Sequence, residues 1–219
     1  MARLCLRAPD GTFTTFDPPD AGTGYYQGTY DAIFSGINPE GAATGSYLDD
    51  YYVWHGFVRA PDGAITEIDD PDAYTARDSG AGTLTMSINP AGAIVGTYMD
   101  KEYAFHGFLR PPDGSITNFD VPGAGKGQYQ GSSACWYIDC YFGITPDGTV
   151  TGMIVDASDV FHGYVRTPQG KFTVFDAPGA GKGTWQGTLT AAITREGAIT
   201  GYYVDANDVV HGFLRLPAP

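Results

Sequence analysis

The sequence predicts an all-β fold, and three observations support that prediction. A unit of about 50 residues recurs along the chain, as in repeat architectures. Its segments are short, rich in Thr, Tyr, Phe, Val and Ile, and bounded by glycine and proline turns. With 31 glycines and 15 prolines in 219 residues, most helices would be interrupted. The clearest mark of the repeat is a His-Gly-aromatic segment, which contains all four histidines: His55, His106, His162 and His211.

Turn glycines set the register of the repeat. In each complete unit 22 residues separate the first turn glycine from the second, as they do for Gly41 and Gly63. From a second turn glycine to the next first one, the separation varies between 27 and 34 residues. The constant spacing predicts a rigid supersecondary element, and the varying one predicts a loop.

Each unit is expected to supply four strands. In the first unit they lie near residues 30–37, 43–48, 53–59 and 64–68. The same four recur after Thr83 and around Tyr141, and the first three recur after Thr188. Four strands in a unit of this length predict a β-propeller blade. We therefore expect a single domain over 1–219, with units starting near 29, 82, 132 and 187.

The N-terminal segment 1–18 is expected to complete the last blade. It supplies strands near 4–7 and 12–16, whereas the last unit has only three strands. A four-bladed ring closed in this way would remove an open sheet edge. It would leave the strand near 4–7 as a surplus strand. A five-bladed ring with an incomplete blade is the alternative.

Composition limits the partners. Twelve Lys and Arg against 25 Asp and Glu give a net charge of −13, which argues against nucleic acids and anionic membranes. Cations and neutral molecules remain as possible partners. No apolar run is long enough for a transmembrane helix, and the start of the chain leads directly into a strand, without the pattern of a signal peptide. Cys135 and Cys140 could form a local disulfide but need not, and Cys5 would remain free.

The repeated histidines are expected to be structural. A residue present once per blade usually makes the same scaffold hydrogen bond in each blade. A zinc site is disfavoured because the blades would separate the four imidazoles. The repeated arginines, such as Arg59 and Arg166, are expected to pair with carboxylates at strand ends.

In a propeller, the crossings between blades and the loops between second and third strands share one rim. On that rim the acidic loops supply candidate ligands for Ca²⁺, which prefers carboxylate oxygens. These metal candidates are Asp49, Asp100, Asp156 and Asp205. The same rim carries repeated aromatic-amide pairs as candidate ligand-binding residues: Tyr26 and Gln27, Tyr129 and Gln130, Trp185 and Gln186.

One insertion interrupts the repeat, at 133–140. Trp136 and Tyr137 beside Asp139 could stack on a sugar ring and accept its hydroxyl groups. The alternative is a packed loop at the channel mouth. The segment 176–184 looks like a phosphate-binding loop, but it leads into a strand and recurs one blade earlier, so we interpret it as a blade crossing.

The segment Ile-Asn-x-x-Gly-x-Ile-x-Gly-x-Tyr-x-Asp followed by His-Gly-Phe resembles bacterial repeat proteins of the HAF type. That family has a His-Ala-Phe strand after a related segment, and its members are described as extracellular, propeller-like repeats. The likeness covers nearly the whole chain, although the second half of the family unit matches poorly. It implies a propeller-like architecture and an extracellular or periplasmic setting, and it brings no catalytic residues.

Three functions follow as hypotheses. The first is a non-enzymatic propeller that binds a small molecule or a glycan through the aromatic-amide loops and the 133–140 insertion. The second is a hydrolase at the channel mouth, with Asp139 or a rim aspartate as base, a histidine as partner and Ca²⁺ as electrophile. The third is an assembly subunit, a strand-mediated homo-oligomer rather than a monomer.

Overall fold

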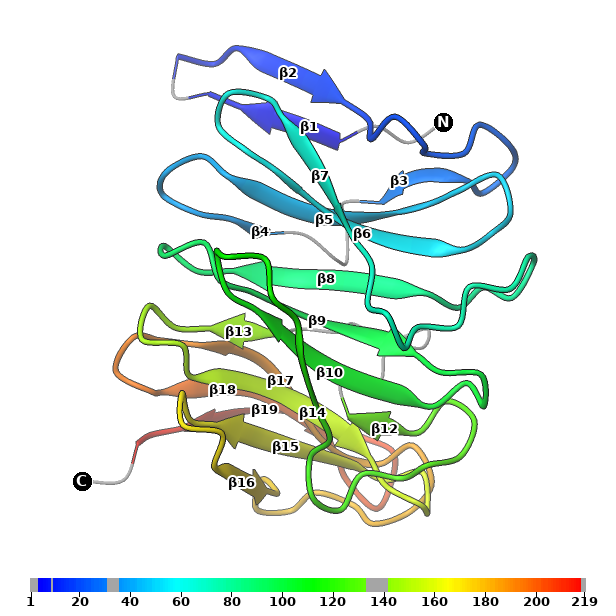
Figure 1. Cartoon of the computed structure of the whole chain (residues 1–219). Helices are drawn as coiled ribbons and strands as arrows, with labels where there is room; N and C mark the ends of the chain where they lie inside the picture. Colours follow the sequence, from blue (N-terminus) through cyan, green and yellow to red (C-terminus); the bar gives the residue numbers. More distant parts are fainter. Residues whose placement is uncertain (1–3, 9, 31–35, 133–141, 218–219) are drawn as a thin grey trace.

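The computed structural model describes residues 4–8, 10–30, 36–132 and 142–217 (Figure 1). All regular structure in these residues is β-strand, which confirms the all-β prediction. The strands form antiparallel units stacked one on another from the N-terminal to the C-terminal end of the chain (Figure 1). The described residues contain no helix long and apolar enough to cross a membrane.

Three units have four strands each. The strands lie side by side in the order in which they follow one another in the chain, and each is antiparallel to the next. Two short strands share the place of the first strand in the first and third units. The first unit has β3 (Gly28–Tyr30), β4 (Gly36–Ile37), β5 (Ala43–Leu48), β6 (Trp54–Arg59) and β7 (Ile65–Ile68). The second has β8 (Thr83–Ile88), β9 (Ile94–Met99), β10 (Phe105–Arg110) and β11 (Thr117–Phe119).

The third unit repeats this plan, and the last has three strands. The third unit has β12 (Gly131–Ser132), β13 (Gly143–Ile144), β14 (Val150–Val155), β15 (Phe161–Arg166) and β16 (Phe172–Phe175). The last has β17 (Gly187–Ile193), β18 (Ile199–Val204) and β19 (Val210–Arg215). Before the first unit, β1 (Leu4–Arg7) and β2 (Phe13–Phe16) form a separate hairpin.

The strands end at the glycine turns that the repeat predicts. In the turn between β4 and β5, Gly41 has a φ of +86° and its amide donates to the Asn38 carbonyl at 3.0 Å. The Asn38 side chain accepts from the Ala42 amide at 2.9 Å, which closes the turn from the other side. Glycine adopts this left-handed backbone without steric cost, so its spacing fixes the strand ends.

Single parallel pairings join neighbouring units. Phe105 at the start of β10 pairs with Gly131, and Phe161 at the start of β15 pairs with Gly187. At Gly131 an added Cβ would lie 2.1 Å from the Phe105 carbonyl oxygen, so only glycine allows this approach. The second strand of each complete unit, β5, β9 or β14, is buried along all six residues and forms the core of the stack.

Closure into a ring is not shown. The hairpin strand β2 pairs only with β1, β19 pairs only with β18, and the two lie at opposite ends of the stack (Figure 1). The hairpin is held on the first unit instead. The Phe16 ring packs edge-on against Phe57 with centroids 6.2 Å apart, and the Arg59 guanidinium lies 4.9 Å from the Phe16 centroid. Among the described residues, β2 is therefore not paired with β19.

The prediction that repeated arginines pair with carboxylates at strand ends is wrong for three of them. The guanidinium groups of Arg59, Arg166 and Arg215 lie over the rings of Phe16, Phe119 and Phe175, each on the preceding fourth strand. Histidines engage the strand-ending carboxylates Asp69, Asp120 and Asp176, and Asp17 accepts from the Thr29 hydroxyl, so these arginines stack on aromatic faces instead.

Candidate functional site

The chain crossings between units and the loops between second and third strands lie along one edge of the stack, on the right in Figure 1. Backbone hydrogen bonds join the two sets of loops. Gly125 and Gly181 in crossings donate to the Val155 and Val204 carbonyls at 2.8 Å. We call this edge the rim. It carries the candidate residues of the first and second hypotheses, except those of the 133–141 segment, which lie outside the described residues.

The four aspartates predicted as metal candidates close the rim loops. In the second unit, one carboxylate oxygen of Asp100 accepts from the Glu102 and Ala104 amides, both at 2.9 Å. The other oxygen faces His106 Nε2 at 3.1 Å. Asp49, Asp156 and Asp205 make the same two backbone contacts in their own loops. Both oxygens are thus engaged within the loop and its histidine.

Each complete unit extends this contact into an Asp-His-Asp chain. The other imidazole nitrogen, Nδ1, faces the aspartate that follows the fourth strand, with distances of 2.9 Å for His55 and Asp69 and 2.8 Å for His106 and Asp120. The corresponding distance for His162 and Asp176 is 2.7 Å. In the last unit His211 contacts Asp205 at 3.1 Å. These chains bind a loop, a third strand and a fourth strand together.

The carboxylates set the charge of the central imidazole. The hydrogen bond that His106 donates to Asp120, and then the one that it donates to Asp100, raise the pKa of His106 to about 9 against the opposing effect of burial. The same contact with His106 lowers the pKa of Asp120. At neutral pH this chain is an imidazolium between two carboxylates. Tyr98 stacks on the ring, with centroids 4.9 Å apart and planes 18° from parallel.

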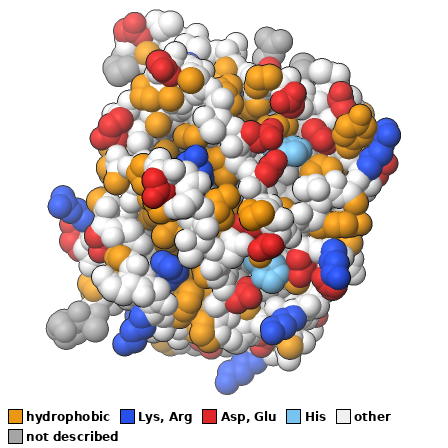
Figure 2. Space-filling view, viewed as in Figure 1, with side chains coloured by type: hydrophobic (Ala, Val, Ile, Leu, Met, Phe, Trp, Pro, Cys, Tyr) orange, Lys and Arg blue, Asp and Glu red, His pale blue; other side chains and the backbone are white. Residues whose placement is uncertain are grey.

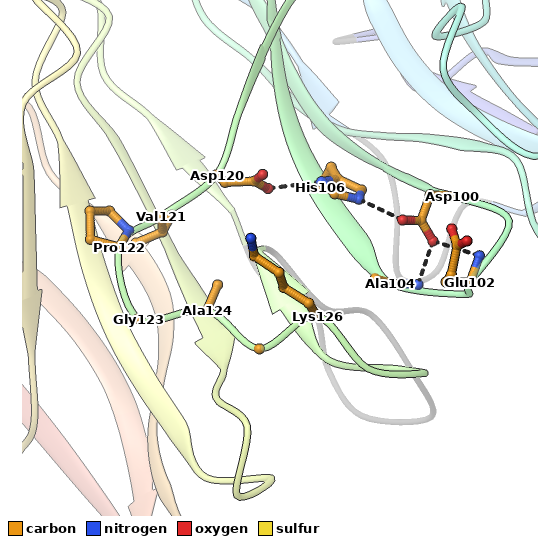
Figure 3. Close-up of a pocket in the computed structure, with 11 residues that line it drawn as sticks. Asp100, Glu102, Ala104, His106, Asp120, Val121, Pro122, Gly123, Ala124 and Lys126 are labelled. Atoms are coloured by element: carbon orange, nitrogen blue, oxygen red, sulfur yellow. Dashed lines mark hydrogen bonds and ion pairs between the residues drawn. The ribbon is translucent and has the colours of Figure 1, made fainter.

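A cleft of about 510 Å³ opens beside this chain, between the second and third units. Its walls are Asp100, Glu102, His106, Asp120 and the crossing 121–126. Figure 3 shows the Asp100-His106-Asp120 chain along one side and the Lys126 amino group reaching in from the crossing. The cleft carries both signs of charge, and Val121, Pro122 and Ala124 line its crossing side. In Figure 2 the histidines on this face of the molecule likewise lie among carboxylates.

The three glutamines of the aromatic-amide pairs hold the crossings in shape. The Gln130 side-chain oxygen accepts from the Gly127 amide at 3.0 Å, and its nitrogen donates to Asp159 at 2.8 Å. Gln186 makes equivalent bonds to Gly183 and Asp208. Gln27, which is buried, accepts from Gly24. These amides therefore position the rings beside them.

Those rings differ in exposure. Tyr26 is 69% exposed and Trp185 47%, whereas Tyr129 packs partly into the core. Tyr26, Tyr129 and Trp185 all have a left-handed backbone, with φ between 55° and 63°. This conformation is uncommon for aromatic residues, and it is held by the loops. The Trp185 amide, for example, donates to the Asp159 carbonyl at 2.7 Å.

The first unit brings the exposed rings of Tyr25, Tyr26 and Tyr51 together with the half-buried ring of Tyr52, and we call these four the tyrosine rim. The Tyr25 and Tyr26 rings lie edge to face, with centroids 4.3 Å apart, and the Tyr52 hydroxyl donates to the Tyr25 carbonyl at 2.7 Å. Tyr25 is 77% exposed and Tyr51 50%. Asp50 ties the two loops together by accepting from the Thr23 amide at 3.1 Å.

Sequence reasoning included Tyr26 in the site and missed Tyr25 and Tyr51. Neither recurs in the other units, so a pattern common to all units does not contain them. An alignment of the units against one another would have marked both as departures. Trp136, Tyr137 and Asp139 lie outside the described residues, as do Cys135 and Cys140, and Cys5 is a free, exposed thiol.

No protein-family model matches the chain, and no curated protein matches it.

Proposed function

We propose that this protein binds a neutral glycan through the tyrosine rim. The observation that carries the proposal is the exposure of Tyr25, Tyr26 and Tyr51 on loops that hydrogen bonds hold in place. Exposed rings in fixed positions can stack on the apolar faces of sugars at small entropic cost. The carboxylate of Asp50 beside them can accept sugar hydroxyl groups.

The repeat also supports a ligand that is itself repetitive. Trp185 presents a further exposed ring from the corresponding crossing of the last unit. A polysaccharide chain that lies along the rim could contact both places, and linked contacts raise the overall affinity. The net charge of −13 favours an uncharged polymer over an acidic one.

Titration calorimetry against a panel of neutral oligosaccharides tests the proposal. We expect binding by the full chain and about two- to tenfold weaker binding after Tyr25→Ala or Tyr26→Ala, since a stacked ring contributes roughly 0.5–1.5 kcal/mol. Phe13→Ala is the matched control, because Phe13 is 64% exposed but lies on β2, away from the rim. No binding to any neutral glycan, or equal losses in all three variants, would overturn the proposal.

Hydrolysis at the cleft is the second candidate, favoured by the carboxylates and Lys126 around His106. Its charge states weigh against it. An imidazolium with a pKa of about 9 is a poor base at neutral pH, and the lowered pKa of Asp120 keeps that carboxyl ionised and a poor acid. We therefore rank binding first. Turnover that is lost in Asp139→Ala or after chelation of Ca²⁺ would reverse this order.

We also propose that the units are propeller blades of the HAF type. The order of the four antiparallel strands and the contact of each fourth strand with the next unit support this interpretation. Ring closure would require β2 to leave β1 and pair with β19. Pairing of β19 with another copy would make the protein an assembly subunit, and mass measurement in solution separates that case from a monomer.

A further inference from the structure

The fourth strand of the first unit carries a carboxylate that no other unit has. Glu67 on β7 lies opposite Phe57 on β6. In the same register, Asn118 lies opposite Phe108 and Val174 opposite Tyr164. The scaffold is built without a carboxylate in those units, so the fold does not require Glu67.

Glu67 joins a histidine and an aspartate on one face of the sheet. Residues two apart on a strand point to the same side, so Glu67 and Asp69 share a face. His55 on the neighbouring strand faces Asp69, with Nδ1 2.9 Å from the carboxylate. One ligand atom from each of His55, Glu67 and Asp69 lies within 4.8 Å of the others. This is the spacing of groups that can surround a single ion.

Neighbouring residues hold the cluster in position. The Tyr47 ring stacks on the His55 imidazole, with centroids 5.1 Å apart and planes 20° from parallel. The Tyr47 hydroxyl also donates to the Glu67 carboxylate, which places it next to the imidazole. On the other side of His55, Asp49 lies 3.6 Å from Nε2. Since 34% of the Asp69 side chain is exposed, an ion can reach the cluster from solvent.

We propose that His55, Glu67 and Asp69 form a binding site for a divalent transition-metal ion of the zinc type. One imidazole nitrogen with two carboxylate oxygens is a donor set that suits Zn²⁺ and related ions, whereas Ca²⁺ prefers oxygen ligands alone. The ion would lie where His55 Nδ1 now contacts the Asp69 carboxylate. The second and third units keep the histidine and the aspartate but lack the third ligand.

The experiment uses the full chain, stripped with a chelator and titrated calorimetrically with ZnCl₂. We expect a binding event in the wild type that becomes at least about tenfold weaker in Glu67→Val. Valine already occupies this position in the third unit, so the variant should keep its fold, which circular dichroism checks. Glu67→Gln separates the carboxylate charge from the shape of the side chain and should weaken zinc binding to a similar degree.

A variant that creates a second site tests the proposal without removing a ligand from the first site. Val174→Glu adds the missing carboxylate beside His162 and Asp176, and Val174 is 39% exposed, so the larger side chain has room. We expect it to add one equivalent of bound Zn²⁺ and to raise the visible absorbance of bound Co²⁺ in proportion. Absence of binding in the wild type overturns the proposal. So does zinc binding that Glu67→Val leaves unchanged and Val174→Glu does not increase.

Discussion

At the scale of single residues, the histidine of each complete unit is explained by two carboxylates. An imidazole has two nitrogens, and in each complete unit one faces the loop aspartate and the other faces the strand-ending aspartate. A glutamine or asparagine could not place two donors on opposite sides in this way. The histidine therefore fixes the loop and the fourth strand at once, and it carries positive charge between the carboxylates where its pKa is raised.

The charge of His106 makes stability depend on pH. Its folded-state pKa of about 9 lies above the ordinary value of 6.5, so its stabilising effect is complete below pH 6.5 and is lost as pH rises through 9. We expect the free energy of unfolding to fall by about 1–2 kcal/mol over this range, since solvent screens the partly exposed group. Chemical denaturation at several pH values measures this slope.

His106→Gln is the matched variant for that measurement. It keeps a polar side chain facing Asp100 but cannot be charged, so its stability should be lower at pH 6.5 and should change less toward pH 9. Because His106 lowers the pKa of Asp120, the wild type should also lose stability in acid as that carboxyl becomes protonated. Equal slopes in the two proteins above pH 6.5 would contradict the assignment.

At the scale of elements, the glycine after each histidine is explained by the next strand. An added Cβ at Gly107 would lie 2.3 Å from the Phe119 ring on β11, and at Gly163 it would lie 2.7 Å from the Phe175 ring on β16. In the second and third units the fourth strand thus lays an aromatic ring over the glycine of the third strand. In β19 the equivalent Gly212 has only the Gly201 carbonyl nearby, at 3.9 Å.

A Gly→Ala substitution at this position should therefore lower the free energy of unfolding in one unit and leave it almost unchanged in another. We expect Gly107→Ala to lower the free energy of unfolding by about 1–3 kcal/mol, because the Phe119 ring must move. Gly212→Ala should change it by less than about 0.5 kcal/mol, as is usual for open surface positions. Thermal and urea unfolding of both variants measure the difference. A cost at Gly212 equal to that at Gly107 would mean that a strand covers β19 in solution.

The sequence was sufficient to place most strands. The second strand predicted at 43–48 is β5 (Ala43–Leu48), and the third and fourth match β6 and β7 to within one residue at their starts. These positions follow from local chemistry, because positive-φ glycines end the strands. Local chemistry does not specify partners. The position of Arg59 over Phe16, the pairing of β2 with β1 and the exposure of Tyr25 and Tyr51 all depend on contacts between distant segments.

At the scale of the whole molecule, burial falls at the C-terminal end of the stack. All six residues of β9 and of β14 are buried, whereas β19 alternates between exposed and half-buried residues. Units of a stacked repeat protein are stabilised by their neighbours, so an end unit opens more readily than an inner one. Local opening of this kind is measured by amide hydrogen exchange.

Hydrogen exchange should therefore distinguish the open stack from a closed ring. The matched segments are β15 and β19, whose His-Gly-aromatic patterns give similar intrinsic exchange rates. β15 pairs with β14 on one side and β16 on the other, whereas β19 pairs with β18 alone. In the open stack we expect the amides of β19 to exchange at least about a hundredfold faster than those of β15, because the hydrogen bonds of an end unit open at a smaller free-energy cost. Equal protection of β19 and β15, accompanied by slow exchange in β2, would instead show that β2 has paired with β19 and closed the ring.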